Sequence, residues 1–385
     1  GLPIFSKNFF IENAVEFEES SMTPTVGSGP YVIDKIDVGK QIIYKYNNDY
    51  WGSGLAINKG RYNFEKIRVE YYADYNSAFE GFKSGDYTFR NEASSKIWAT
   101  GYDFPNFLNG WVIKEDISHG NLSPGQSFIF NLRKDKFSDI KVREAVGLMF
   151  NFEWSNKTLF YGLYERNNSF WDNSELKAIG IPSGEEKLIL EKIYDNPNED
   201  LFLEEAFSFD KSSEKQLDRK ILKKASTLLD QSGWFVGQDG LRRKNGETLD
   251  IDILNDSQAF DRIINPYIQN LRRLGINATH VKIDNAQITE RKRAFDFDII
   301  VGFLSTQMTP GSELEQYFGS ASADFSIFNL SGLKDSKIDK LIKVVRSAKT
   351  RHELNTSVKA LDRVLRSKII WVPQWYKNKH TVAYY

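Results

Sequence analysis

Histidines and paired carboxylates are the residues that most often do chemistry in proteins, and here their spacing matches no common catalytic or metal-binding pattern. The four histidines are scattered, and the sequence of 385 residues contains no cysteine that could complete a metal site. They are His119, His280, His352 and His380. Pairs such as Asp296/Asp298 and Glu313/Glu315 share one face of a strand, which a solvated edge explains as well as a hydrolase does. We expect no catalytic residue, no metal ligand and no cofactor.

Nucleotide and nucleophile motifs are also missing from the sequence. Gly27-Ser-Gly-Pro-Tyr31 looks like a glycine-rich loop, but it precedes a strand and lacks the third glycine of a dinucleotide fingerprint. We interpret it as a tight turn. There is no Gly-x-Ser-x-Gly elbow, no phosphate-binding loop and no His-Glu-x-x-His pair. The sequence motifs therefore show no catalytic centre, and a hydrolase is not expected.

Composition and charge describe an ordinary globular protein of two or three domains. With 51 basic and 52 acidic side chains, the net charge of −1 gives no global attraction for nucleic acid or for an anionic membrane. No segment approaches the 18 to 20 apolar residues of a membrane helix, and the first residues lack a signal-peptide pattern, so we expect a processed chain. The absence of cysteine is compatible with an oxidising compartment such as the periplasm.

Aromatic residues are abundant, at 14% of the chain. The 28 Phe, 18 Tyr and 8 Trp either fill cores or line a cleft that grips varied ligands through flat apolar faces, and both interpretations stay open.

The first 125 residues are expected to be mostly strands. Short β-branched or aromatic runs at 31–36, 41–46 and 67–72 are bounded by Gly, Asn or Asp. A helix at 76–85, ended by Gly85 and followed at once by a strand, predicts a strand–helix–strand unit.

Helical periodicity dominates the remainder of the chain. Apolar stripes predict a helix from 139 past 149, a helix at 216–232 stopped by Gly233, and further helices at 260–274, 287–293, 335–348 and 351–367. Strands are expected at 249–254, 276–283, 297–302, 369–376 and 381–385, whereas 172–215 is polar and is expected to be a long irregular excursion. Alternating strands and helices with no low-complexity linker predict a two-lobed α/β protein whose chain crosses between lobes on strands.

A series of motifs then resembles one family along nearly the whole chain. In the first third they are Thr25-Val-Gly-Ser-Gly-Pro-Tyr31, Asn48-Asp-Tyr-Trp-Gly52, Arg61-Tyr-Asn-Phe-Glu65, Phe82-Lys-Ser-Gly-Asp-Tyr-Thr-Phe-Arg90 and Trp98-Ala-Thr-Gly-Tyr-Asp-Phe-Pro105. Later ones include Val142-Arg-Glu-Ala145, Thr158-Leu-Phe-Tyr-Gly162, Ala294-Phe-Asp-Phe-Asp298 and Val372-Pro-Gln-Trp-Tyr376. Their order is similar to that in family 5 extracellular solute-binding proteins, particularly the YejA-type oligopeptide binders.

This resemblance implies a two-lobed periplasmic-binding-protein fold of the peptide-binding, Venus-flytrap type. Residues 1–128 and 371–385 would form lobe I and residues 129–370 lobe II, with a hinge near Phe130 and Ile370. The family also implies that the protein captures oligopeptides or peptidoglycan-derived peptides (muropeptides) in the periplasm. It would deliver them as a monomer to the permease of an ABC importer in the inner membrane.

The sequence departs from the family pattern at its ends. Members carry a signal peptide and a further N-terminal segment, and they continue past the position of Tyr385, so we expect lobe I to be incomplete here. Two other classes stay open: a sensory solute-binding domain of a regulator, which would carry a basic helix-turn-helix, and a glycan-processing hydrolase, which would need paired carboxylates in a cleft.

Candidate ligand-binding residues follow from the same resemblance. Residues 301–307 match a segment that lines the cleft in related peptide binders, where an acidic group can pair with the ammonium group of the peptide; here the segment has Phe303, Ser305 and Thr306 and no carboxylate. The other candidates are Arg90, Asn91, Glu92 and Asn329, with surface or local turns as the alternative for each. We expect Trp371, Trp375 and Tyr376 to pack rather than to contact ligand.

Overall fold

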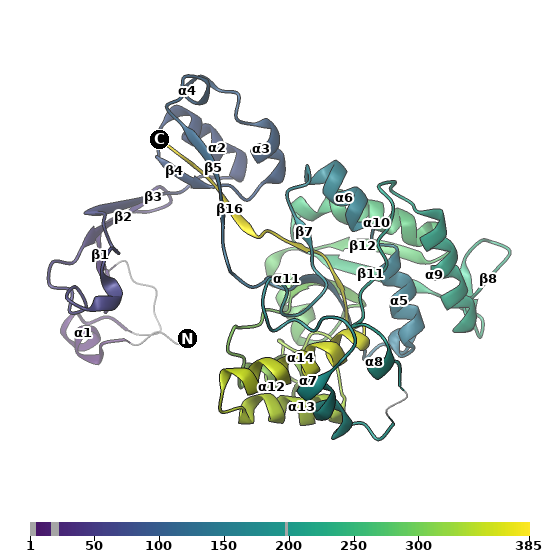
Figure 1. Cartoon of the computed structure of the whole chain (residues 1–385). Coiled ribbons are helices and arrows are strands. Elements are labelled where there is room, and N and C mark those ends of the chain that lie inside the picture. Colours follow the sequence, from purple (N-terminus) through teal and green to yellow (C-terminus); the bar gives the residue numbers. More distant parts are fainter. Residues whose placement is uncertain (1–4, 17–22, 197–198) are drawn as a thin grey trace. The chain divides into compact units, whose positions relative to one another are not determined.

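The computed structural model describes residues 5–16, 23–196 and 199–385 (Figure 1). Two predictions touch residues outside these ranges: the expected processed start at residues 1–4 and positions 197–198 of the polar excursion. The chain forms two compact units. Unit 1 comprises Gly1–Asn91, Asp103–Lys114 and Val382–Tyr385, and unit 2 comprises Glu92–Tyr102 and Glu115–Thr381. The expected lobe boundaries stay a prediction, because lobes are defined by a hinge and these units by their internal contacts.

The three strands that the sequence pattern predicts in unit 1 are confirmed, and they form a small antiparallel sheet in the order β1-β2-β3. Its strands are β1 (Tyr31–Asp37), β2 (Gln41–Tyr46) and β3 (Lys66–Glu70). The short helices α1 (Lys7–Glu12) and α4 (Pro105–Leu108) and the 3-10 turn η1 (Ala56–Asn58) also belong to this unit.

Helix α2 (Tyr75–Ser84) lies where the sequence predicts it. The Asp74 carboxylate caps it by accepting hydrogen bonds from the backbone N–H groups of Asn76 and Ser77, and Gly85 ends it in the left-handed conformation at φ +84°. The predicted strand–helix–strand unit is nevertheless wrong, because the strands on either side of α2 belong to different sheets. β3 pairs with β2, whereas β4 (Phe89–Asn91) pairs with β16 (Lys379–Tyr384) from the end of the chain.

Unit 2 is built on a five-stranded mixed sheet in the order β12-β11-β13-β6-β14. Its strands are β6 (Gln126–Phe130), β11 (Asp250–Asn255), β12 (Asn277–Lys282), β13 (Ile299–Phe303) and β14 (Trp371–Pro373). β11 runs parallel to β12 and β13, and β6 runs antiparallel to β13 and β14. The parallel pair β11 and β12 is joined by helix α10 (Asp261–Arg273), which confirms the strand–helix–strand prediction for this region.

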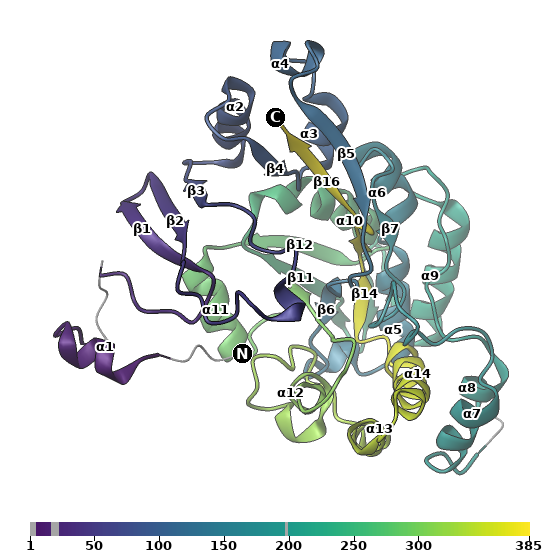
Figure 2. The same cartoon turned by 60° about the vertical axis from the view of Figure 1, so that its left-hand side comes forward.

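Two hydrophobic cores lie on the two faces of this sheet. Successive side chains of a strand point to opposite faces, so Phe128 and Phe130 pack in one core and Ile129 in the other. The first core also receives α5 (Ile140–Leu148), α9 (Arg219–Gln231) and α10; the second receives α12 (Glu313–Phe318), α13 (Ser336–Ser347) and α14 (Arg351–Ser367). Figure 2 shows α9 and α10 on one side of the strands and α12 to α14 on the other.

Most predicted helices of unit 2 are confirmed, but the irregular excursion is wrong in part. Within 172–215 the chain forms α7 (Gly184–Glu191) and α8 (Asp200–Leu203), both packed against α14. The remaining elements are small. They are α3 (Ser95–Thr100), α6 (Phe152–Leu159), α11 (Asn285–Arg293), β5 (Ile113–Ser118), β7 (Glu165–Arg166), β8 (Phe235–Val236), β9 (Arg242–Lys244), β10 (Glu247–Thr248), β15 (Trp375–Tyr376), η2 (Asp135–Phe137), η3 (Gln258–Phe260) and η4 (Ser320–Ser322).

Within the described ranges, every helix is too short or too polar to cross a membrane.

Candidate functional site

The segment that follows β13 is held in place by the loop that precedes β6. The backbone N–H of Leu304 donates to the carbonyl oxygen of Gly125 at 3.1 Å, and the Ser305 hydroxyl donates to the carbonyl oxygen of Pro124 at 3.0 Å. Gly125 has φ +64°, and a Cβ atom on it would lie 2.4 Å from the carbonyl oxygen of Leu304. Only glycine fits there, because both the backbone conformation and the close approach exclude a side chain.

Thr306 and Gln307 are held in place by a second loop, which contains Phe170 and Trp171. The Thr306 hydroxyl donates to the carbonyl oxygen of Phe170 at 2.6 Å, and the indole N–H of Trp171 donates to the carbonyl oxygen of Gln307 at 3.2 Å. Phe170 stacks on Trp371 with ring centroids 4.0 Å apart and planes at 7°. Thr306 and Gln307 thus rest on the loop 169–171.

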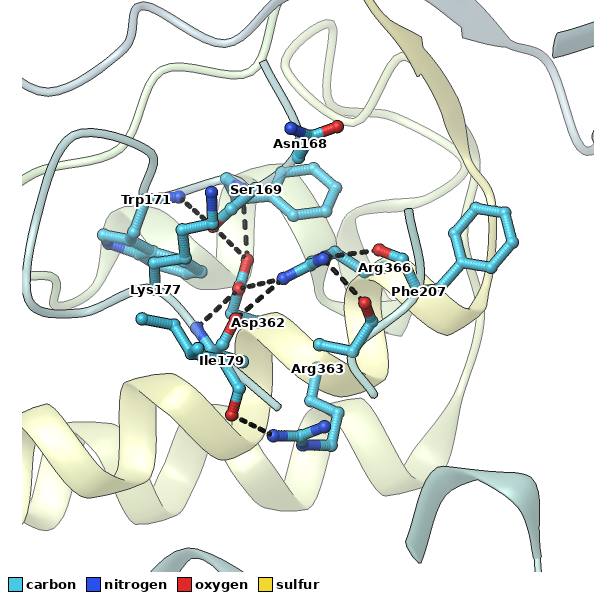
Figure 3. A network of polar contacts seen from close by, with 12 residues as sticks. Asn168, Ser169, Trp171, Lys177, Ile179, Phe207, Asp362, Arg363 and Arg366 are labelled. Atoms are coloured by element: carbon cyan, nitrogen blue, oxygen red, sulfur yellow. Dashed lines mark hydrogen bonds and ion pairs between the residues drawn. The ribbon is translucent and has the colours of Figure 1, made fainter. Parts of the chain in front are cut away.

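That loop is in turn anchored by a buried carboxylate on α14, Asp362 (Figure 3). Asp362 is fully buried and accepts hydrogen bonds from the Ser169 hydroxyl at 2.8 Å and from the backbone N–H groups of Phe170 and Ala178 at 3.1 and 3.0 Å. Burial raises the pKa of Asp362, and the Arg366 guanidinium 3.4 Å away acts in the opposite direction. The network therefore links α14 through the loop to the segment after β13.

Arg366 completes the network by holding a second stretch of chain. Its guanidinium donates to the carbonyl oxygens of Ala178, Ala206 and Phe207 and to the Ser208 hydroxyl, at distances between 2.7 and 2.9 Å. A charge that is buried with this many acceptors rigidifies the segments that supply them.

Phe303, Ser305 and Thr306 thus come together on one supported segment. Phe303 is 52% exposed, which gives a ligand an apolar surface. The two hydroxyl groups donate to backbone carbonyls, so their oxygen atoms remain able to accept hydrogen bonds from ligand N–H groups. The sequence analysis did not identify two further exposed aromatic residues, Phe325 and Phe328. They precede Leu330, and the side chain of Leu330 lies beside Gly302 in β13.

The structure places Asn329 inside a loop. It is fully buried; its amide nitrogen donates to the carbonyl oxygen of Gly319 and to the Ser322 hydroxyl, and its amide oxygen accepts from Ser331 and Gly332. These contacts are those of a local turn, which is the alternative to ligand binding that the sequence leaves open for Asn329. A ligand contact for Asn329 stays a prediction.

Arg90, Asn91 and Glu92 are divided between the two units. In unit 1, the Arg90 guanidinium lies over the rings of Tyr75 and Phe79, 4.6 and 5.3 Å from their centroids, and Asn91 is exposed on β4.

Glu92, in unit 2, is fully buried, and its carboxylate accepts from the backbone N–H of Ser94 at 2.7 Å. The ammonium group of Lys377 donates to the backbone carbonyl of Glu92 at 3.0 Å, and burial lowers the pKa of Lys377. Binding roles for Arg90, Asn91 and Glu92 likewise stay predictions.

The carboxylate pairs considered for a hydrolase all have partners. Asp298 pairs with Lys136 at 2.8 Å and Asp296 with Arg291 at 3.1 Å. Glu315 pairs with Arg346, and Glu313 accepts from the backbone N–H of Gly311. Across the described ranges no three His, Cys, Asp or Glu side chains gather as metal ligands.

The tryptophans near the return of the chain pack as predicted. Trp371 and Trp375 are 3% and 9% exposed. The Trp375 ring lies against Phe160 at 4.5 Å and Phe260 at 6.1 Å between centroids. Much of the high aromatic content therefore fills cores, with Phe303, Phe325 and Phe328 among the exceptions.

Comparisons with known proteins agree with this architecture. The sequence model described as "Bacterial extracellular solute-binding proteins, family 5 Middle" matches residues 2–325. The chain is 37% identical over 374 residues to the probable peptide-binding protein YejA of Agrobacterium fabrum, covering 96% of this chain and 61% of the relative. It is 30% identical to the peptidoglycan-binding protein YepA of the same organism, again covering 96% of this chain and 61% of the relative.

Solved structures show the same fold at low sequence identity. Lactococcal OppA, complexed with an endogenous peptide in the closed conformation, has a TM-score of 0.70 and 19% identity, with 99% of this chain and 66% of that one covered. The oligopeptide-binding protein AppA of Bacillus subtilis, complexed with a nonapeptide, has a TM-score of 0.65 and 19% identity, with 93% and 62% covered. The predicted α/β periplasmic-binding-protein fold class is confirmed.

The chain spans about three fifths of the length of the curated relatives that it matches. Because the matches cover nearly all of this chain, and the family model alone covers most of it, the chain belongs to the family 5 bacterial extracellular solute-binding proteins.

Proposed function

We propose that this protein is the substrate-binding component of an ABC importer and that it captures oligopeptides or peptidoglycan-derived peptides. It hands them to the permease in the inner membrane. It acts in the periplasm as a monomer, binds without chemical conversion, and needs no cofactor.

The relatives support this proposal through what they bind. The Agrobacterium relatives are named as a probable peptide-binding and as a peptidoglycan-binding protein, and the structural neighbours OppA and AppA hold peptides. Family membership supports a location outside the cytoplasm, because the family is one of extracellular solute-binding proteins.

The observation that carries the proposal is the supported segment 303–306. Exposed Phe303 and two hydroxyl oxygens with accepting capacity suit a ligand that has apolar groups and many amide N–H donors. Peptides and muropeptides have both. The loop 169–171 and the buried Asp362 hold the segment rigid, and a preorganised site loses less entropy when a ligand binds.

Calorimetric titration with short peptides and with muropeptides tests the proposal. Ser305→Ala and Thr306→Val each remove one hydroxyl from the segment, and we expect each to weaken binding about fivefold to tenfold, the usual effect of one lost hydrogen bond. Thr356→Val is the matched control, because that hydroxyl donates to the carbonyl oxygen of His352 within α14. Equal affinities for the wild type and for both segment variants would contradict the assignment of this surface.

A further inference from the structure

Gln126 lies beside Phe303 at one end of the central strands of unit 2. The antiparallel pairing of β6 with β13 places Gln126 directly opposite Phe303. Phe128 and Val301, the next pair on the same face of the sheet, pack in or against the first hydrophobic core. Residues directly opposite in an antiparallel pair have Cβ atoms about 5 Å apart. The half-buried Gln126 side chain therefore lies next to exposed Phe303, on the same face.

The side-chain amide of Gln126 is oriented by a second glutamine. The amide nitrogen of Gln126 donates to the amide oxygen of Gln374 at 2.7 Å. The amide oxygen of Gln126 is not buried, and among the described residues no group donates to it. An amide oxygen has two lone pairs, so it can accept a hydrogen bond from an N–H group of a ligand.

Gln374 is itself held firmly. It is fully buried, its backbone N–H donates to the carbonyl oxygen of Gln126 at 3.1 Å, and its carbonyl oxygen accepts from the backbone N–H of Asn167 at 3.2 Å. A buried side chain on a backbone that is fixed on both sides has little freedom to turn. The amide oxygen of Gln374 therefore fixes the direction of the Gln126 amide.

The Gln374 side chain also has a destabilising feature that packing does not explain. Its amide nitrogen is buried and, within the described ranges, has no hydrogen-bond partner. A buried donor without a partner destabilises a protein, and an apolar side chain of similar length, such as methionine, would avoid that cost. Methionine could not offer an amide oxygen to Gln126, so the contact with Gln126 is the gain that accompanies the cost.

We propose that Gln126 contacts the ligand and that Gln374 is its positioning residue. This inference rests on the proposed function and deepens it. The Gln126 amide oxygen accepts a hydrogen bond from a backbone N–H of the peptide, next to an apolar group that covers Phe303. Together with the hydroxyl oxygens of Ser305 and Thr306 it forms a set of uncharged acceptors, which suits a peptide backbone with unsubstituted amides.

Methylation of the ligand backbone tests the proposal, because a methyl group replaces the hydrogen atom that Gln126 would accept. The probe is the short peptide, or the peptide part of the muropeptide, that binds the wild type most tightly in calorimetric titration, synthesised with one backbone nitrogen methylated at a time. At the sensitive positions methylation should raise the Kd of the wild type about tenfold. In Gln126→Met the penalty at one of these positions should fall at least about fivefold, while the others stay as in the wild type.

Two further variants separate positioning from stability. Gln374→Met should reduce the methylation penalty at the same position as Gln126→Met does, and a merely structural role of Gln374 would not move the penalty at one ligand position. Gln216→Met is the matched control, because the Gln216 amide nitrogen donates to the amide oxygen of Gln269 at 2.8 Å, which makes another glutamine pair in unit 2. It should leave every methylation penalty unchanged.

The outcomes distinguish this inference from the proposed function. Unchanged penalties in a Gln126→Met variant that still binds the peptide would overturn the ligand contact and leave the proposed function intact. Unchanged penalties in Gln374→Met alone would overturn its positioning role. The scan of the wild type guards against variants that do not fold: if no methylated position raises the Kd more than about twofold, the proposal is wrong. Absence of any binding to the wild type would overturn both the inference and the proposed function.

Discussion

At the scale of single residues, the candidate surface depends on groups that accept hydrogen bonds and not on charge. Ser305 and Thr306 have their donors engaged by backbone carbonyls, and residues 301–307 contain no carboxylate. A free peptide amino terminus therefore finds no ion-pair partner on this segment.

A prediction about ligands follows from this absence of charge. Acetylation of the amino terminus of a bound peptide should change its dissociation constant by less than about threefold, because no charge-assisted hydrogen bond to this segment is lost. Calorimetric titration of matched free and acetylated peptides measures the difference. A loss of a hundredfold or more would show that an acidic group elsewhere captures the ammonium.

The glycine at position 125 gives a prediction about stability. Gly125→Ala should destabilise unit 2 by at least about 2 kcal/mol, because it adds left-handed strain and a clash with the Leu304 carbonyl. Gly162→Ala is the control: that glycine also has a positive φ, at +72°, but no atom lies within 4 Å of its added Cβ. Urea unfolding should show a larger loss in the free energy of unfolding for Gly125→Ala than for Gly162→Ala. Equal losses would mean that the loop around residue 125 shifts to accommodate the added methyl group.

At the scale of elements, the sequence predicted those features that depend on local pattern. The apolar stripe at 216–232 correctly predicted helix α9 (Arg219–Gln231), which ends before Gly233 at φ +81°. The alternation of strand and helix correctly predicted the strand–helix–strand unit formed by β11, α10 and β12. The pairing of β4 with β16 could not be predicted, because no local pattern encodes which distant strand will supply the partner.

The polar excursion was misjudged for a related reason. Helices α7 and α8 are short, and both pack on α14; α7 is also held by the ion pair between Glu186 and Arg363 of α14 at 2.7 Å. Isolated helices of this length are not stable, so their sequence alone carries a weak signal. The same holds for the Asp362 network, whose members come from 169, 178 and α14.

The cap of α13 gives a pH-dependent prediction at this scale. Burial works to raise the pKa of Asp335, but Lys368 at 2.6 Å and the backbone N–H groups of Lys337 and Ile338 outweigh it, so the pKa is lowered below its ordinary value of 3.8. A lowered pKa in the folded state means that the carboxylate stabilises the protein above about pH 4, and that this contribution disappears as the pH falls through the folded-state value.

Asp335→Asn keeps a capping side chain but removes the charge. It should therefore cost about 1 kcal/mol of the free energy of unfolding at pH 7, and the difference from the wild type should shrink toward zero near pH 2. Urea unfolding at the two pH values measures it. Asp135→Asn, at an exposed position in the first turn of η2, is the control and should have little effect at either pH. If Asp335→Asn lowers the free energy of unfolding equally at pH 7 and pH 2, the charge has no stabilising role.

At the scale of the whole molecule, the chain consists of two compact units that are connected on strands, with the five-stranded sheet of unit 2 as the larger body. Residues 303–306 extend from the end of one of its central strands, and β5 and β16 connect the units. The chain belongs to the family 5 extracellular solute-binding proteins, and this membership supports the proposal that the protein captures peptides for import.

Native mass spectrometry of the gently purified protein, with and without a mixture of short peptides and muropeptides, tests the proposed function most directly. The account predicts adducts in the mass range of peptides or muropeptides, and weaker adducts for the Thr306→Val variant than for the Thr356→Val control. A folded protein that retains no adduct under any of these conditions would contradict the proposal that this chain binds peptides.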